Sequence, residues 1–278
     1  MVISVASGKG GTGKTTIAVN LALALSNTQY LDCDVEEPNG HIFLKPDITK
    51  RVSVTLPYPR VNYDKCDFCG DCAKICEYGA IAVVKNQVLI FDDLCHSCGS
   101  CVMLCPQKAI YEVPQEIGII EIGEGKGVLF AHGILKLGST RAHPLVQEVK
   151  KYSDVSKTII IDAPPGTSCP VVEAVKNADF CLLVTEPTPF GLNDLKLAVE
   201  MTREIGVPFG IVINRSDGKD SIIFDYARAE NIPILLKIPM EREIAEAYSR
   251  GISLVESDDN YREVFRKLFA DIQGRVGL

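Results

Sequence analysis

The chain has 278 residues, a formal net charge of −7 and eleven cysteines, with 46% hydrophobic and 23% charged residues. This composition is that of a globular protein that can bury a core, and it excludes a largely disordered chain. The acidic charge argues against a nucleic-acid partner, because such partners are bound through Lys and Arg that neutralise phosphates. No apolar run reaches the length of about eighteen residues that a membrane span needs, and the apolar start leads into a glycine motif. We therefore expect a cytoplasmic protein that binds no membrane.

The predicted elements begin with a strand, a glycine loop and a helix. Residues Met1–Val5 are apolar and β-prone, and Thr15–Ser26 has the Ala/Leu-rich pattern of a helix. A second helical pattern covers Leu192–Ile205. Further short apolar runs occur at Thr158–Ile161, Phe180–Val184, Phe209–Ile213 and Ile234–Ile238. Strands that alternate with helices predict an α/β fold, in which a mostly parallel sheet carries helices on both faces.

A cysteine-dense segment interrupts this alternation. Eight of the eleven cysteines lie between Cys66 and Cys105, and without a secretion signal such crowding favours metal ligation over disulfides. We interpret residues 60–112 as an inserted domain, so that residues 1–59 and 113–278 form the main domain. Cys66–Ile81 and Cys95–Ile110 align at an offset of 29 residues, and both contain C-x-x-C-G-x-C-x-x-x-C. This repeat predicts two copies of one unit that pack face to face.

The glycine loop has the pattern of a phosphate-binding loop. Gly8–Thr15 fits G-x-x-x-x-G-K-[ST], with a predicted strand before it and a predicted helix after it. Glycines allow backbone N–H groups to surround phosphates, Lys14 can reach the outer phosphates, and Thr15 can ligate Mg²⁺. The main domain is therefore expected to be a P-loop NTPase. Its expected nucleotide-binding residues in this loop are Gly8, Gly10, Gly11, Thr12, Gly13, Lys14, Thr15 and Thr16.

A second lysine, Lys9, follows the first glycine, and here the sequence resembles the MinD/Mrp/nitrogenase iron protein group of P-loop ATPases. The resemblance implies an ATP-dependent homodimer in which Lys9 crosses to the partner's nucleotide and acts like an arginine finger. It also implies that Asn214 contacts the adenine base. Pro239 and Glu241 belong to a segment that resembles the second base-side loop of the group.

Two acidic segments resemble the switches of the same group. Leu31–Asp34 is similar to the first switch, in which the later carboxylate, Asp34, orients the attacking water. Ile161–Thr167 is similar to the second switch, which implies that Asp162 holds the Mg²⁺ shell and that the Gly166 amide lies near the γ-phosphate. Together with Lys9 and Lys14, these two aspartates are the expected catalytic residues. Carboxylates at the carboxyl ends of strands face the ligand crevice of open α/β sheets.

The spacing of the cysteines is that of bacterial two-cluster ferredoxins, given twice, and Pro106 follows the second run. The inserted domain is therefore expected to be a small α+β, ferredoxin-like domain that binds two [4Fe-4S] clusters. The fourth cysteine of each run ligates the other cluster in such proteins. One cluster is thus expected on Cys66, Cys69, Cys72 and Cys105. The other is expected on Cys76, Cys95, Cys98 and Cys101. Zinc sites are the rival interpretation, but they lack the duplicated three-plus-one arrangement.

Three functions remain open. The first is a dimeric ATPase that couples nucleotide state to electron transfer, with a redox protein as partner. The second is an ATP-dependent carrier or scaffold for iron-sulfur or other metallocofactors, with an acceptor protein as partner. Cys169, seven residues after Asp162, has a spacing similar to that of a cysteine in the nitrogenase iron protein, but a matching second cysteine is missing. The third is a MinD-like positioning ATPase, although the mixed charges within Tyr261–Ile272 predict packing against the domain instead of lipid binding.

Overall fold

The chain forms two compact units in the computed structural model, which describes residues 1–277. The first, here called the sheet unit, comprises Met1–Val52, Ile120–Ile134 and the residues from Ala142 onward. The second, here called the cysteine-rich unit, comprises Ser53–Ile119 and Leu135–Arg141. The chain passes between them in two long strands, β3 (Asp47–Val61) and β6 (Ile110–Gly125).

The sheet has the order β11-β10-β9-β1-β8-β2-β7-β6-β3. Its other strands are β1 (Val2–Ser7), β2 (Thr28–Asp32), β7 (Val128–Leu135), β8 (Thr158–Pro165), β9 (Phe180–Thr185), β10 (Phe209–Ser216) and β11 (Ile234–Pro239). Every pairing from β11 to β7 is parallel. The expected mostly parallel α/β sheet is therefore confirmed. Because parallel strands end at the same edge, the segments after β1, β2, β8, β9 and β10 meet there.

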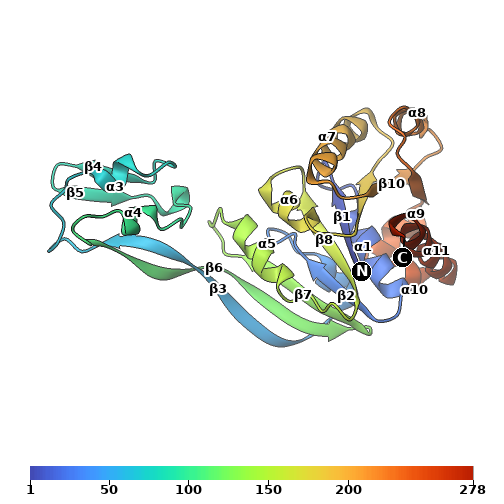
Figure 1. Cartoon of the computed structure of the whole chain (residues 1–278). Coiled ribbons are helices and arrows are strands. Elements are labelled where there is room, and N and C mark those ends of the chain that lie inside the picture. Colours follow the sequence, from blue (N-terminus) through green and yellow to red (C-terminus); the bar gives the residue numbers. More distant parts are fainter. Residues whose placement is uncertain (278) are drawn as a thin grey trace. The chain divides into compact units, whose positions relative to one another are not determined.

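Helices cover this sheet in layers (Figure 1). They are α1 (Lys14–Ala24), α2 (Gly40–Leu44), α5 (Ala142–Lys150), α6 (Cys169–Val175), α7 (Pro189–Ile205), α8 (Ser221–Ala229), α9 (Arg242–Ser249), α10 (Leu254–Ser257) and α11 (Asp259–Val276). Helices α1 and α11 pack against each other, and α6 packs against α5, α7 and β8. The buried Phe265, Leu268 and Ile272 place α11 in the core around α1 and β1, so the expected packing of this segment is confirmed. Within residues 1–277, no helix combines the length and apolarity that crossing a membrane requires.

Strands β6 and β7 were not expected, and they form a hairpin. The two residues between them, Lys126 and Gly127, have φ values of 52° and 77°. Two consecutive positive φ angles are typical of the tight turn that matches the twist of paired strands. The expected limits of the inserted domain, residues 60 and 112, both lie inside strands, the first in β3 and the second in β6. The composition of the sequence changes at these residues, but the extended backbone conformation does not.

The cysteine-rich unit repeats its backbone as well as its sequence. It contains α3 (Asp71–Lys74), the hairpin of β4 (Ile81–Val84) and β5 (Gln87–Ile90), a 3₁₀ turn (Asp92–Leu94) and α4 (Ser100–Met103). Gly70 before α3 and Gly99 before α4 both have positive φ, at 81° and 75°. Helix α3 contacts α4. The 29-residue sequence repeat therefore corresponds to two similar one-helix units in contact.

Candidate functional site

The glycine loop between β1 and α1 is fixed by contacts that only glycine allows. Gly13 has a φ of 92°, and a Cβ there would lie 2.1 Å from Nδ2 of Asn214. The same Nδ2 donates a hydrogen bond of 2.8 Å to the carbonyl oxygen of Thr12. A Cβ on Gly8 would lie 2.0 Å from the carbonyl oxygen of Asp194 in α7. The loop is thus held between the end of β10 and α7.

This loop lines a cavity of about 630 Å³, within the usual range for small-molecule sites. The structure brings together in its wall most of the residues expected to bind nucleotide or to act on it. They are Gly10, Gly11, Gly13, Lys14, Thr15, Thr16, Asp34, Asn214, Pro239 and Glu241. The expected residues Gly8, Lys9, Thr12, Asp162 and Gly166 are not part of this wall. The wall thus combines the glycine loop with the residues expected to lie beside the base.

Three aspartates, Asp32, Asp34 and Asp162, lie beside the cavity. The parallel register of β2 and β8 places Asp32 next to Asp162, and Asp34 lines the cavity itself. Asp162 is fully buried, and its Oδ2 accepts a hydrogen bond of 2.8 Å from the hydroxyl of Tyr30. Its Oδ1 is buried without a hydrogen-bond partner among the described residues. Asp32 accepts bonds from the backbone N–H of Asp34 at 3.2 Å and of Gly40 at 2.9 Å. Residues 34–40, which begin at the end of the expected first switch, are therefore hydrogen-bonded to Asp32 of β2 at both ends.

Burial sets the protonation of these groups. Burial raises the pKa of Asp34 to about 7. The negative charge of Asp162 adds to this rise, and the positive charge of Lys14 opposes it. Burial also raises the pKa of Asp162, against the opposing influence of Lys14 and Thr15. A buried acidic group with one free oxygen, next to a hydroxyl in a P-loop, fits the shell of a Mg²⁺ ion.

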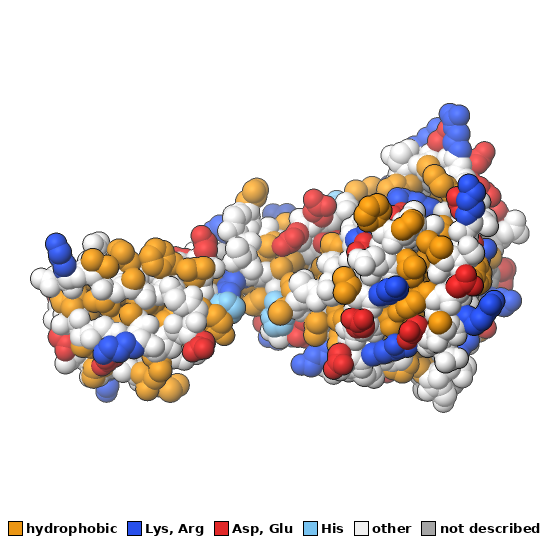
Figure 2. Space-filling model, turned by 90° about the horizontal axis from the view of Figure 1, so that it is seen from above, with side chains coloured by type: hydrophobic (Ala, Val, Ile, Leu, Met, Phe, Trp, Pro, Cys, Tyr) orange, Lys and Arg blue, Asp and Glu red, His pale blue; other side chains and the backbone are white. Residues whose placement is uncertain are grey.

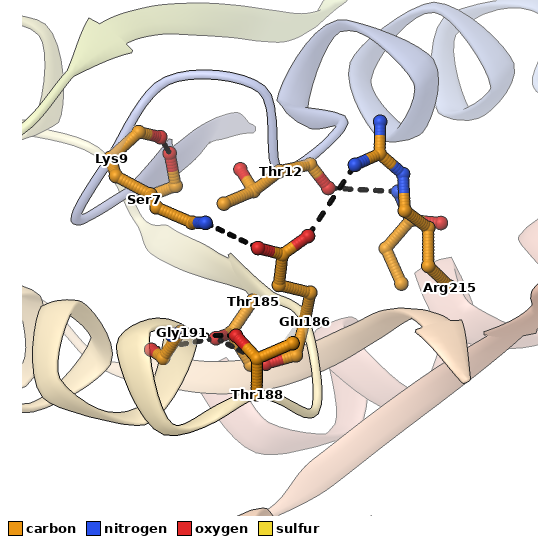
Figure 3. A network of polar contacts seen from close by, with 9 residues as sticks. Ser7, Lys9, Thr12, Thr185, Glu186, Thr188, Gly191 and Arg215 are labelled. Atoms are coloured by element: carbon orange, nitrogen blue, oxygen red, sulfur yellow. Dashed lines mark hydrogen bonds and ion pairs between the residues drawn. The ribbon is translucent and has the colours of Figure 1, made fainter. Parts of the chain in front are cut away.

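The second lysine of the loop contacts its own chain (Figure 3). The ammonium group of Lys9 forms an ion pair with Glu186, which directly follows β9. Nη1 of Arg215 lies 3.4 Å from the other carboxylate oxygen of Glu186. Three polar residues near the site, Glu186, Arg215 and Tyr30, were not predicted from the sequence. An acidic residue that follows an apolar run supported the assignment of Asp162, which comes after residues 158–161, and Glu186 likewise follows the run at residues 180–184.

In the cysteine-rich unit, the eight closely spaced cysteines surround two separate hollows. One is lined by Cys66, Cys69, Cys72 and Cys105. The other is lined by Cys76, Cys95, Cys98 and Cys101. Each hollow thus combines three cysteines of one run with the fourth cysteine of the other run, which is the grouping expected from the spacing.

The donor set of these hollows fits iron-sulfur clusters. All eight thiols are free of disulfides. Backbone N–H groups of Ala80 and Ala109 donate to the sulfurs of Cys76 and Cys105 at 3.2 and 3.3 Å, and such hydrogen bonds to sulfur tune cluster potentials. Burial raises the pKa of Cys101 to about 11, so a bound metal would have to displace a proton from it. Among the described residues, no three or more His, Cys, Asp or Glu side chains are grouped to hold a single metal ion.

Cys169 stands apart from both hollows. It is exposed at the first position of α6, in the segment that follows the expected second switch. No further cysteine of the sheet unit is exposed, since Cys33 and Cys181 are buried.

Known proteins resemble this chain over most of its length. Residues 3–255 match the family model of the CobQ/CobB/MinD/ParA nucleotide-binding domain. An uncharacterized protein of Methanocaldococcus jannaschii is 32% identical over 95% of both chains. The iron-sulfur cluster carrier protein of Aquifex aeolicus is 28% identical over 92% of this chain and 62% of its own length.

Solved structures share the fold. The cell division ATPase MinD of Pyrococcus furiosus is similar with a TM-score of 0.60 and 22% identity, over 98% of both chains. The septum site-determining protein MinD of Pyrococcus horikoshii, complexed with Mg-ADP, has a TM-score of 0.58 and 19% identity, over 99% of this chain and 97% of its own.

Proposed function

We propose, since the chain belongs to the CobQ/CobB/MinD/ParA family of nucleotide-binding domains, that it is a homodimeric ATPase whose nucleotide state controls electron transfer through two [4Fe-4S] clusters. One observation carries the proposal. A chain with a P-loop cavity also surrounds two hollows with four cysteine sulfurs each. The four thiolates that each cluster needs are therefore grouped without any further ligand.

The nucleotide site has the groups that phosphoryl transfer needs. Lys14 and the loop N–H groups would hold the phosphates, and Thr15 and Asp162 would hold Mg²⁺. When bound, Mg²⁺ neutralises charge on the phosphate oxygens. Asp34 lines the cavity and orients the attacking water, and a carboxyl group with a pKa of about 7 can accept its proton near neutral pH. Lys9 would add positive charge at the nucleotide of a second copy.

The polypeptide between α2 and the first cysteine run connects the nucleotide site to the expected cluster sites. The backbone N–H of Gly40, the first residue of α2, donates a hydrogen bond to the carboxylate of Asp32. Strand β3 begins soon after α2. Strand β3 then continues into the cysteine-rich unit. A movement of the first switch would therefore act on a segment that leads directly to the first cysteine run.

Exposed apolar side chains beside the cysteines support exchange with a redox protein. Ile75 and Leu104 directly precede Cys76 and Cys105 and are 42% and 54% exposed. Met103 is 82% exposed. Figure 2 shows hydrophobic side chains on the surface of the cysteine-rich unit. Apolar groups close to a cluster are suited to a transient protein contact in which electrons pass. When bound, each cluster supplies one-electron chemistry at low potential.

The second candidate is an ATP-dependent carrier or scaffold for iron-sulfur clusters. It is favoured by the names of relatives such as the iron-sulfur cluster carrier proteins of Aquifex aeolicus and Pyrococcus horikoshii, which are 28% and 27% identical. The exposed thiol of Cys169 would then be a candidate ligand for a labile cluster. This function predicts transfer of iron and sulfide to an apo-protein, which closed four-thiolate sites resist.

The test compares electron delivery in different nucleotide states. Reduced protein is mixed with a viologen dye as electron acceptor in the presence of MgATP or MgADP, and the rate of dye reduction is measured. The same measurement is made on Lys14→Ala and, as a matched control, on the exposed Lys151→Ala. We expect rates that differ between MgATP and MgADP in wild type and Lys151→Ala, and equal rates in Lys14→Ala. Equal rates in all samples would refute gating. Loss of iron to an apo-ferredoxin, dependent on ATP, would favour the carrier.

A further inference from the structure

We propose that Glu186 is a positioning residue for Lys9, which it holds within its own chain until the nucleotide of a second copy takes its place. This inference rests on the homodimer proposed above, in which Lys9 acts across the interface. The carboxylate of Glu186 forms an ion pair with Lys9 on one oxygen and faces Arg215 with the other (Figure 3).

The backbone of Glu186 is anchored where β9 ends. Its carbonyl oxygen accepts a hydrogen bond of 2.8 Å from the N–H of Thr188, the N-cap of α7. A Cβ on Gly191 would lie 2.3 Å from the same oxygen, so the first turn of α7 packs directly on it. The hydroxyl of Thr188 in turn accepts the N–H of Gly191 at 2.9 Å. The carboxylate therefore extends toward the glycine loop from a rigid base.

The backbone of Lys9 is held at the other end of the pair. Its carbonyl oxygen accepts a hydrogen bond of 2.6 Å from the hydroxyl of Ser7. The side chain of Lys9 is 33% exposed, whereas that of Glu186 is only 14% exposed. Lys9 can thus move into solvent by side-chain rotation, whereas the side chain of Glu186 is largely enclosed.

Arg215 allows the pair to open. A largely buried carboxylate that loses its only cation is strongly destabilised. Because Arg215 lies 3.4 Å from Glu186, that carboxylate keeps a positive neighbour when Lys9 leaves. A partly exposed lysine–carboxylate pair contributes little net stability in water, and a triphosphate carries more negative charge than one carboxylate. The nucleotide of a second copy would therefore outcompete Glu186 for Lys9.

The experiment uses the full-length protein with Glu186→Gln, and Glu230→Gln as a matched control. Glu230 pairs with Arg203 at 2.7 Å and is not part of the nucleotide cavity. Sedimentation velocity measures dimerisation with Mg²⁺ and a non-hydrolysable ATP analogue. Acylation of Lys9 in the nucleotide-free protein, followed by mass spectrometry, measures how freely its amine reacts. Dimerisation alone is repeated in the Lys9→Ala background, because the acylation site is absent there.

We expect Glu186→Gln to increase acylation of Lys9 and to tighten the analogue-dependent dimer about twofold to fivefold, the range of a partly exposed ion pair. Glu230→Gln should change neither, and Glu186→Gln should have no effect on dimerisation when Lys9 is alanine. Unchanged acylation, or a weaker dimer in Glu186→Gln, would overturn the inference. A wild-type protein that never dimerises would instead refute the homodimer, while acylation still decides whether Glu186 restrains Lys9.

Discussion

Replacing Gly13 by alanine tests the geometry of the phosphate loop. The backbone at Gly13 has a φ of 92°, which costs a residue with a Cβ about 1–2 kcal/mol. The new Cβ would also lie 2.1 Å from Nδ2 of Asn214. Asn214 must then give up its hydrogen bond to Thr12, which adds about 0.5–1.5 kcal/mol. We expect Gly13→Ala to lower the free energy of unfolding by about 1.5–3.5 kcal/mol in total.

Gly11 provides the control, because its φ is 79° but a Cβ there would meet nothing within 4 Å. Gly11→Ala should therefore cost only the conformational part, about 1–2 kcal/mol. Urea denaturation of the nucleotide-free protein, followed by far-UV circular dichroism, measures both. In an Asn214→Ala background the cost of Gly13→Ala should fall to that of Gly11→Ala. Equal costs of the two glycine substitutions in the wild-type background would refute the contact between the loop and β10.

Three further predictions concern the clusters and the buried acids. Cys105→Ser should reduce bound iron from about eight to about four atoms per chain, whereas Cys169→Ser should leave it unchanged; equal losses would contradict the grouping in the hollows. Asp34→Asn should raise the free energy of unfolding above pH 7 by up to about 4 kcal/mol, which is about three pKa units at about 1.4 kcal/mol each, and leave it nearly unchanged at pH 4. The reason is that a carboxyl whose folded-state pKa is raised to about 7 contributes stability that is lost as pH rises from its unfolded value through 7. A constant difference across this pH range would argue against that pKa. Tyr30→Phe should cost about 1–3 kcal/mol by urea denaturation, because Asp162 loses its hydrogen-bond donor.

Much of the sheet unit could be predicted because local pattern and motif agree. The apolar runs at residues 158–161, 180–184, 209–213 and 234–238 all lie in β-strands of the parallel sheet. Buried parallel strands are apolar on both faces, so short continuous runs identify them. Strand β3 gave no such signal, since most of its residues from Asp47 to Val52 are exposed. Its content of β-branched residues was the one available indication.

The candidate site shows a different limit. The spacing pattern was enough to group the cysteines, because each set of three lies within seven residues and the fourth cysteine of such a run ligates the other cluster. The pair of Lys9 and Glu186 joins positions 177 residues apart. Only the order of β1, β9 and β10 in the sheet brings them together, and no periodic pattern encodes that order. The resemblance in the loop implied a role for Lys9 in a partner, but not the carboxylate that it contacts in its own chain.

The central claim is that one chain binds both nucleotide and two clusters and couples them. The most direct measurement is iron and sulfide analysis of anaerobically purified protein, combined with EPR of the reduced protein with and without MgATP. About eight iron and eight sulfide per chain are predicted, together with an EPR change on MgATP addition that Lys14→Ala abolishes. A protein that binds MgATP yet contains no iron, or whose EPR spectrum stays the same with MgATP bound, would contradict the claim.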